Sequence, residues 1–584
     1  MGTVPPRTDS TGRERWKVII SSSLGTAFEW YDFLLYGALA PVIAKQFFSG
    51  VNETAAFIFA LLTFSAGFVA RPFGSLVFGM IGDLVGRKRT FVATIMLMAL
   101  PTFLVGLLPG YATWGIYAPA TLIVLRVLQG LAVGGEYGGA LVYVAEHSEP
   151  GKRGKDTSWL SAMTPAGIIL ALSATLVTRT ISGESALAEW AWRIPFLASI
   201  VLFGISMWLR LKLKESPVFE EMKAAARDKR RPVREAFGEW RYLRTAILLT
   251  FGVNTAIGVI AYTSEFYSQF FMARTLGIDP VTINWVMLPS LLLSVPMYIV
   301  CGWLTDKLGR KPVFLIGTLL AALTLQPAFR LMTHYGNAAL EAAQRAAPVV
   351  VFADPANCSV QFNPVSAAAL TSSCDIAKGY LASRMVSYQN QALPPGSIAS
   401  LKIGNTMLQA FDGTGMPKAA FAAREKQFQA DVQKALTGNG YPALADPAHV
   451  HRGVLICIMT YLLSLLAMIY TPAGAWMTEL FPTRIRYTAI SLPYNIGAGW
   501  FGGFMPSVAF AMVAGNGGVY FGLWYPVGLL ALAVLIAGFG LPDMRNRQLN
   551  APLGDGESGG AGRGVEQVVE QRVVCEAVQG GARS

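Results

Sequence analysis

A short motif that occurs twice constrains this chain more than any other feature. Residues 79–89 read GMIGDLVGRKR, and residues 302–312 read GWLTDKLGRKP. The copies share two glycines, an aspartate and an Arg-Lys pair, all at one offset (302 − 79 = 223). Each copy follows one long apolar stretch and precedes the next. Repetition on this scale inside an apolar chain predicts two homologous membrane-embedded halves.

The composition agrees with a membrane protein. Hydrophobic residues make up 53% of the chain and charged residues 14%, whereas a soluble protein has roughly 25% charged residues. The net charge of +12 is better explained by basic cytoplasmic loops than by nucleic-acid binding. The first 17 residues are polar, and the apolar stretch after them carries Glu29 and Asp32. It therefore does not read as a cleavable signal peptide.

Apolar stretches long enough to cross a membrane recur along the chain, because a spanning helix needs about 20 residues. We predict twelve, at 17–47, 56–80, 90–109, 117–146, 157–180, 191–211, 245–272, 281–304, 313–333, 453–477, 486–513 and 519–541. Lipid cannot satisfy the backbone groups of an open strand, so the expected fold class is an all-α membrane protein.

Basic residues are concentrated in alternate loops. They occur in Arg87-Lys88-Arg89, Lys152-Arg153, Lys307-Arg310-Lys311 and Arg484-Arg486, and eleven more lie in the segment 210–244. The loops near 48–55, 110–116 and 181–190 contain none. The positive-inside rule then predicts that both termini are cytoplasmic. The basic linker either contacts anionic lipid headgroups or is a solvated positive segment.

Four longer sequence segments resemble a known protein family. They are FEWYDFLLYG (28–37), RVLQGLAVGGEYGGALVYVAEH (126–147), WAWRIPF (190–196) and TELFPTRIRYTAISLPYNIGAGWFGG (478–503). With the paired loops, they resemble the metabolite:proton symporters of the major facilitator superfamily, which include transporters of α-ketoglutarate, citrate, shikimate and proline or betaine. The resemblance covers about residues 16–335 and 452–541.

The resemblance implies two six-helix bundles that alternate access to a central cavity. We expect a cytoplasmic N-terminus at 1–16, a first bundle at 17–211, a cytoplasmic linker at 212–244, helices 7–9 at 245–335, helices 10–12 at 452–541 and a disordered cytoplasmic tail at 542–584.

Residues 336–451 interrupt this pattern between the ninth and tenth spans, on the predicted outer side. Their charges are nearly balanced, several prolines occur, and 415–436 has the spacing of an amphipathic helix. About a hundred residues are enough for a small soluble domain. Cys358 and Cys374 have fifteen residues between them, and thiols in an oxidising compartment tend to pair, so we predict a disulfide. The four histidines are scattered and predict no metal site.

Acidic residues inside spans suggest proton handling, because buried charge is costly and usually functional. Glu29 and Asp32 share one helical face. They repel each other when both are ionised, so one can hold a proton at neutral pH. Glu136 lies among closely spaced glycines in the fourth span. The alternative for each acid is a fixed bond to a neighbouring arginine or tyrosine.

Arginines inside spans are candidates for substrate binding. Arg71 and Arg126 stay charged in any environment, and a guanidinium can hold a carboxylate with two parallel bonds. A static intramembrane ion pair is the alternative. Polar groups of the second half that either line a cavity or bond between helices are Asn254, Tyr262, Tyr494 and Asn495. Tyr36 is a further substrate-binding candidate, as is Gln129, which stands with Arg126 in a segment that resembles the family's fourth-helix motif.

By resemblance, the duplicated loops form a cytoplasmic gate. Its expected residues are Asp83, Arg87, Asp306 and Arg310, with Glu146 paired to Arg153 and Glu479 paired to Arg484. We expect these groups at helix ends within reach of water, where each exposed pair contributes under about 1 kcal/mol.

No phosphate-binding loop and no hydrolase motif occurs. ATP is therefore not expected to drive this protein directly. The resemblance and the charges inside spans together imply a transporter that is not an enzyme and needs no cofactor besides a proton gradient. The expected activity is import of a small organic acid or zwitterion with a proton, by a monomer in the lipid of a bacterial inner membrane. The alternatives are a transporter-like nutrient sensor, an antiporter or exporter of an organic acid, and a membrane-anchored module with 336–451 as its active domain.

Overall fold

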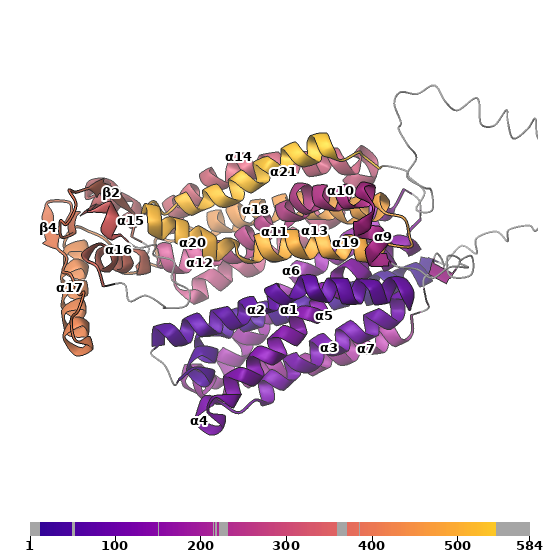
Figure 1. Ribbon diagram of the computed structural model, residues 1–584, viewed down its shortest axis with the longest axis horizontal. Helices are drawn as coiled ribbons and strands as arrows, with labels where there is room; N and C mark the ends of the chain where they lie inside the picture. The colour runs from indigo at the N-terminus through magenta and orange to yellow at the C-terminus, as the bar shows by residue number, and fades with distance from the viewer. Residues whose placement is uncertain are drawn as a thin grey trace, which may run out of the picture. The chain divides into compact units, whose positions relative to one another are not determined.

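The first half of the chain forms a bundle of long helices (Figure 1). The computed structural model describes residues 12–49, 53–149, 151–213, 215, 219–220, 232–358, 371–384 and 386–544. Within them the first bundle contains α1 (Gly12–Phe47), α2 (Glu53–Leu84), α3 (Arg87–Leu107), the short α4 (Tyr111–Trp114), α5 (Tyr117–His147), α6 (Arg153–Ala186) continued by the π-helical η1 (Leu187–Ala191), and α7 (Arg193–Leu211).

The second half forms a similar bundle, preceded by α9 (Pro232–Gly238). Its first span alternates between α-helical and π-helical segments: α10 (Trp240–Leu249), η2 (Thr250–Asn254), α11 (Thr255–Ala261), η3 (Tyr262–Tyr267), α12 (Ser268–Phe270) and η4 (Phe271–Thr275). The other spans are α13 (Pro280–Leu308), α14 (Arg310–Gly336), α18 (Arg452–Leu480), α19 (Arg486–Tyr494) with the π-helical η6 (Asn495–Gly502) and α20 (Met505–Asn516), and the 3₁₀ turn η7 (Phe521–Leu523) with α21 (Trp524–Gly540).

Ten of the described helices are long and apolar enough to cross a membrane. Large apolar side chains point outward from them, among them Val201, Leu292, Leu323 and Phe539, each more than 60% exposed. A soluble protein rarely exposes so much apolar surface, whereas lipid accommodates it. The helices α1 and α2 have 36 and 32 residues but are not among the ten, so the count of twelve spans stays a prediction.

The segment between α14 and α18 contains a mixed sheet, which we call the insertion. Its elements are α15 (Ala338–Ala346), β1 (Val349–Ala353), the 3₁₀ turn η5 (Pro355–Asn357), α16 (Ser373–Ser383), β2 (Tyr388–Ala392), β3 (Ser400–Ile403), β4 (Thr406–Gln409) and α17 (Lys418–Gly438). The strand order is β2-β1-β3-β4. Strands β1 and β2 are parallel, and the β1–β3 and β3–β4 pairs are antiparallel.

The sheet has a buried face and an exposed face. Val349 and Val351 of β1 are buried, as are Leu401 and Ile403 of β3, and the residues between them are more exposed. This alternation places one face of the sheet on the core of the insertion. Helix α16 contacts β1 and β3. The predicted amphipathic helix is α17, whose buried positions include Val432.

The fold-class prediction is confirmed for the bundles and incomplete for the insertion. Four short strands were missed because the run at Val349–Ala353 is only five residues long. A run of that length does not separate a strand from part of a buried helix by periodicity alone. The predicted N-terminal segment 1–16, residues 221–231 of the basic segment 210–244 and the tail from 545 onward lie wholly or mostly outside the described residues.

The insertion is attached to the ends of several second-half helices. The Tyr388 amide donates to the Gly517 carbonyl at 2.8 Å, and the Ala445 amide donates to the Gly277 carbonyl at 3.0 Å. Gly517 has a positive φ of 90°, and a Cβ there would lie 2.4 Å from the Tyr388 carbonyl oxygen. We call this end of the bundles the insertion end. The opposite end, with the duplicated loops, is the loop end.

Cys358 and Cys374 form a disulfide, which links the end of η5 to the start of α16. The separation of 16 residues corresponds to about 3 kcal/mol of stabilisation in the loop-closure treatment. We predict that replacing both cysteines by serine lowers the free energy of unfolding of the insertion by about that amount. Limited proteolysis of the full chain in rising urea measures it.

The control for this experiment is Cys457→Ser, because Cys457 is a free cysteine. Equal urea midpoints for the control and the double variant would contradict the prediction.

Candidate functional site

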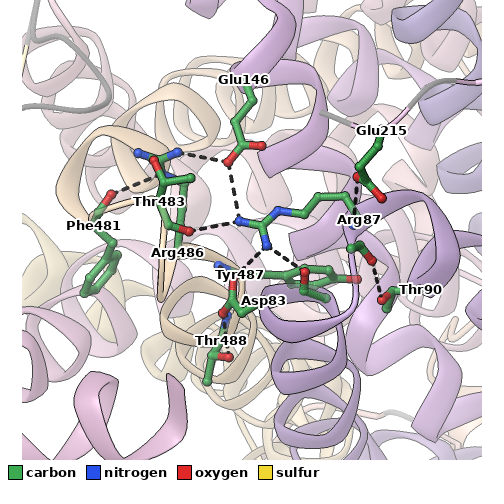
Figure 2. Close-up of polar contacts among 12 residues, drawn as sticks. Asp83, Arg87, Thr90, Glu146, Glu215, Phe481, Thr483, Arg486, Tyr487 and Thr488 are labelled. Carbon is green, nitrogen blue, oxygen red and sulfur yellow. Dashed lines mark hydrogen bonds and ion pairs between the residues drawn. The ribbon is translucent and has the colours of Figure 1, made fainter. Parts of the chain in front are cut away.

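At the loop end, the first duplicated aspartate caps a helix of the other half. The Asp83 carboxylate accepts hydrogen bonds from the Thr488 amide at 2.9 Å, the Thr488 hydroxyl at 2.8 Å and the Tyr487 amide at 3.3 Å. These amides belong to the first turn of α19, where backbone N–H groups lack helical partners and the helix dipole favours an anion. Figure 2 shows this contact beside Arg87.

The second duplicated aspartate makes the equivalent contact. The Asp306 carboxylate accepts from the Gly154 amide at 2.9 Å and from the Lys155 amide at 2.8 Å. Both amides lie in the first turn of α6, in the first half. Each copy of the motif therefore caps a helix N-terminus that belongs to the opposite half.

Two charge networks extend from these aspartates. In the first, Arg87 lies 3.0 Å from Asp83 and 3.5 Å from Glu146, and Glu146 lies 3.0 Å from Arg486. Figure 2 shows Arg87 between these groups, with its guanidinium also on the Thr483 carbonyl. All four charged side chains are at least nine-tenths buried.

The second network repeats the first with the equivalent residues. Arg310 lies 3.2 Å from Asp306 and 3.0 Å from Glu479, and Glu479 lies 3.4 Å from Arg153. The glutamates and the outer arginines of the two networks share one offset (479 − 146 = 333; 486 − 153 = 333). We call the two networks together the gate.

The first glycine of each motif allows this close approach. A Cβ at Gly302 would lie 2.6 Å from Ser158 Cβ, and a Cβ at Gly79 would lie 2.9 Å from Thr488 Cα. Real Cβ atoms do not come so close to a neighbouring helix, so a larger residue would push the two halves apart at the gate.

Two parts of the gate prediction were wrong. Glu146 pairs with Arg87 and Arg486, not with Arg153, and Glu479 pairs with Arg310 and Arg153, not with Arg484. Sequence neighbourhood suggested the wrong pairs, because each real partner comes from another helix.

Most gate residues are also buried away from water, and Asp306 is the partly exposed member. Asp83 and Arg87 are 0% exposed and Arg310 is 2% exposed, so the small energies of exposed pairs do not apply to them. Arg484, which was predicted to belong to the gate, instead forms an ion pair with Glu235 of α9 and is itself exposed.

Nearer the middle of the first bundle, Asp32 and Arg126 form a buried ion pair with 2.9 Å between Oδ2 and Nη1. Gln129 donates to the other Asp32 oxygen at 3.2 Å, and the ring of Tyr36 lies 3.9 Å from the Arg126 guanidinium carbon. These four predicted residues come together from α1 and α5.

A second pair lies beside the first. Arg71 of α2 is 3.4 Å from Glu29, and its guanidinium lies over the rings of Phe33 and Phe68 at 4.3 and 4.9 Å. Glu29 is 3% exposed and Arg71 is 5% exposed. The two acids on one face of α1 therefore each have their own arginine.

Glu136 has a fixed partner that the sequence analysis missed. It pairs with Arg210 at the end of α7 and accepts from the Thr94 hydroxyl at 2.7 Å. Arg210 was assigned to the basic linker, yet it is 0% exposed. The structure therefore shows Glu136 in an ion pair, and its predicted part in proton handling stays a prediction.

The predicted polar residues of the second half differ in their surroundings. Tyr494 lies 3.1 Å from the Tyr470 hydroxyl, and Asn495 donates to the Gly134 carbonyl at 2.8 Å, which links the two halves. Tyr262 stacks on Phe266 with 5.3 Å between ring centroids. Neither amide atom of Asn254 has a hydrogen-bond partner among the described residues.

Aromatic rings fill the space between the two halves near Arg71. Trp30 of α1 lies 6.5 Å from Tyr262 and 6.4 Å from Phe266, and Phe68 of α2 lies 5.6 Å from Tyr262. We call Trp30, Phe33, Phe68, Tyr262 and Phe266 the aromatic wall. Tyr262 was predicted from the sequence, and the other four rings were missed, because aromatic residues are common in any apolar core.

Sequence reasoning also missed Glu265, which lies within an apolar span and is 0% exposed. The rule that selected Glu29, that charge inside a span is unusual, applies equally to Glu265. Among the described residues, no group of three or more His, Cys, Asp or Glu side chains is arranged to hold a metal ion.

Comparisons with known proteins match this arrangement. Residues 17–239 match the family described as "Sugar (and other) transporter", and residues 251–343 match the "Major Facilitator Superfamily". The inner membrane metabolite transport protein YhjE of Escherichia coli strain K12 is 36% identical over 344 residues, which cover 58% of this chain and 75% of that protein. The chain belongs to the major facilitator superfamily.

Two further comparisons support the membership. The proline/betaine transporter of Escherichia coli strain K12 is 36% identical over 329 residues, so the match spans 54% of this chain and 64% of that relative. A structure of the proton:xylose symporter XylE bound to 6-bromo-6-deoxy-D-glucose matches with a TM-score of 0.58 at 14% identity, over 92% of this chain and 98% of that chain. This likeness shows the fold.

As a member of this superfamily, the chain is a multi-pass membrane protein, and its relatives are named as transporters and not as enzymes. This bears out the prediction that the chain is not an enzyme. The structure thus contains two sets of buried charges: contacts that join the halves at the loop end, and pairs held within the first half.

We predict that Asp83→Asn and Asp306→Asn each weaken the closed gate by about 3 kcal/mol, because breaking a buried pair leaves an unmatched charge. The readout is maleimide labelling of Ser158→Cys, a buried position on α6 that faces Gly302, in a chain without the other free cysteines. Labelling should quicken about a hundredfold in both variants.

The matched control is Glu149→Gln, an exposed acid at the same end, which should leave the labelling rate unchanged. A large effect of one aspartate alone would show that the two networks are not equivalent.

Proposed function

We propose that this protein imports a small zwitterion or organic acid together with a proton, by alternating access, across a bacterial cytoplasmic membrane. In this proposal both termini are cytoplasmic, the loop end faces the cytoplasm, and the chain works as a monomer in lipid without a cofactor other than the proton gradient.

The buried Asp32–Arg126 pair carries the proposal. Asp32 lies 2.9 Å from the Arg126 guanidinium, and protonation of a carboxylate in such a pair would remove half of the pair. The arginine cannot give up its own proton, so it would then need another anion. A substrate carboxylate is such an anion. Proton and substrate would therefore favour each other's binding, which is what symport requires.

The neighbouring site suggests the kind of substrate. Arg71 offers a second guanidinium for a carboxylate, and the aromatic wall surrounds it with ring faces that attract cations. A zwitterion with a carboxylate and an alkylated ammonium group would engage both. Two relatives are named for such compounds: the proline/betaine transporter, and a glycine betaine/proline/ectoine/pipecolic acid transporter of Dickeya dadantii.

The gate supplies the alternation. Its cross-half contacts hold the loop end closed in this structure, and import requires a second state in which they are open. Because capping bonds and buried pairs are lost together, the two states exchange cooperatively between discrete arrangements.

We predict that Asp32→Asn loses accumulation of glycine betaine driven by a pH gradient in proteoliposomes, by at least about tenfold. The amide keeps the shape of the side chain and removes its titration. The control is Glu189→Gln, an exposed acid near the end of α6, which should accumulate normally. Wild-type accumulation by Asp32→Asn would contradict the proton-coupling assignment.

We also predict that Trp30→Leu weakens glycine betaine binding about tenfold, since a cation over an aromatic face contributes about 0.5–2 kcal/mol. The shift of the melting temperature with ligand concentration measures it. The control is Trp285→Leu, because Trp285 is 63% exposed on the outer face of α13. If succinate stabilises the protein and glycine betaine does not, the substrate is an organic acid.

A further inference from the structure

Glu265 is a buried acid for which the described residues provide neither a hydrogen bond nor a paired cation. Its side chain is 0% exposed, and neither carboxylate oxygen has a hydrogen-bond partner among the described residues. Each of the three buried acids in the middle of the first half, by contrast, has an arginine. An unmatched buried polar group in a native fold calls for a physical explanation.

The surroundings of Glu265 contain hydroxyl groups and rings. The Tyr298 hydroxyl on α13 is within electrostatic range of Glu265, and it too has no hydrogen-bond partner among the described residues. Tyr262 on the same span is also within electrostatic range of Glu265. One step further away, Arg71 and Glu29 are within range of Tyr262, and Cys301 is within range of Tyr298. Helix α18, which contacts η3, carries Tyr470, and η3 itself ends at Tyr267. The cation of this set, Arg71, is already paired with Glu29.

The hydroxyl groups next to Glu265 on its own span donate to backbone carbonyls. Thr263 donates to the Val259 carbonyl at 2.5 Å and Ser264 donates to the Ile260 carbonyl at 2.7 Å. The Gln269 amide donates to the backbone carbonyl of Glu265, not to its side chain. The carboxyl group therefore receives no donor from its own span.

An ionised carboxylate in these surroundings would be very unfavourable. Without a counter-charge or hydrogen bonds, a buried ion in a medium of low dielectric constant costs tens of kcal/mol, and such a group becomes neutral instead. The structure is thus compatible with the protonated acid. Glu265 also lies in the π-helical segment η3 (Tyr262–Tyr267), and π-helical turns often occur at functional sites in helices.

We propose that Glu265 is a second proton-binding site, in the half opposite to Asp32. In the closed arrangement it holds the proton as a neutral carboxylic acid. When the halves separate and water reaches η3, the O–H bond breaks, the proton passes to water and a hydrated carboxylate remains. The meaning of this step for transport rests on the function proposed above, whereas the protonation itself can be measured without substrate.

Infrared spectroscopy of the full-length chain in liposomes tests the site directly, because a protonated carboxylic acid has its own carbonyl stretching band. We expect this band in the wild type at pH 7, and also in the control Glu189→Gln, which removes an exposed acid far from η3 in the sequence. Glu265→Gln should lose it. A band of unchanged intensity in Glu265→Gln, or no band in the wild type, would overturn the proposal.

A second pair of variants keeps the test decisive if Glu265→Gln does not fold. The band should persist in the double variant Glu29→Gln/Asp32→Asn, which lacks the acids of α1. It should change in frequency in Tyr298→Phe, which lacks the neighbouring hydroxyl. Loss of the band in the double variant would assign the proton to α1 and reject Glu265.

Proton uptake measured with a pH-sensitive dye during glycine betaine transport gives the functional readout. Glu265→Gln should take up one proton fewer per betaine than the wild type, and an unchanged ratio would reject a coupling role. If glycine betaine is not transported at all, the proposed substrate is wrong, and the infrared result still decides whether Glu265 holds a proton.

Discussion

The need to match every buried charge governs this structure. An apolar bundle cannot solvate a carboxylate or a guanidinium, so a lone ion inside it is very unfavourable. The described half-bundles bury many such groups, and nearly all of them are paired. Pairs whose two residues belong to one half differ from pairs that join the two halves, because only the second kind breaks when the halves separate.

The central pairs lie within the first half. Asp32 pairs with Arg126, Glu29 with Arg71 and Glu136 with Arg210, all among α1, α2, α5 and α7. Such pairs survive when the two halves move as rigid bodies. In the proposed function, this is what lets them bind a proton or a ligand whichever end of the bundle is open.

The gate also contains contacts of the opposite kind, which join the halves. Asp83 caps α19 and Asp306 caps α6, while Glu146–Arg486 and Arg153–Glu479 cross the same boundary. Separation of the halves removes all of them together and admits water to the freed groups. The duplicated sequence thus yields two equivalent closures, and the insertion, attached at the far end of the second half, leaves both intact.

The sequence by itself determined the apolar helices, the duplicated halves, the position of the insertion and the candidate charges such as Asp32 and Arg126, because composition and spacing are local properties. Only the tertiary structure decided the partners: Glu146 with Arg486, Glu136 with Arg210, and Glu265 with none among the described residues. These pairings depend on which helix faces are brought together. A sequence pattern does not show which residues that are distant along the chain will be in contact. The sheet of the insertion was missed for a related reason, because a short apolar run is ambiguous between helix and strand until it pairs with another strand.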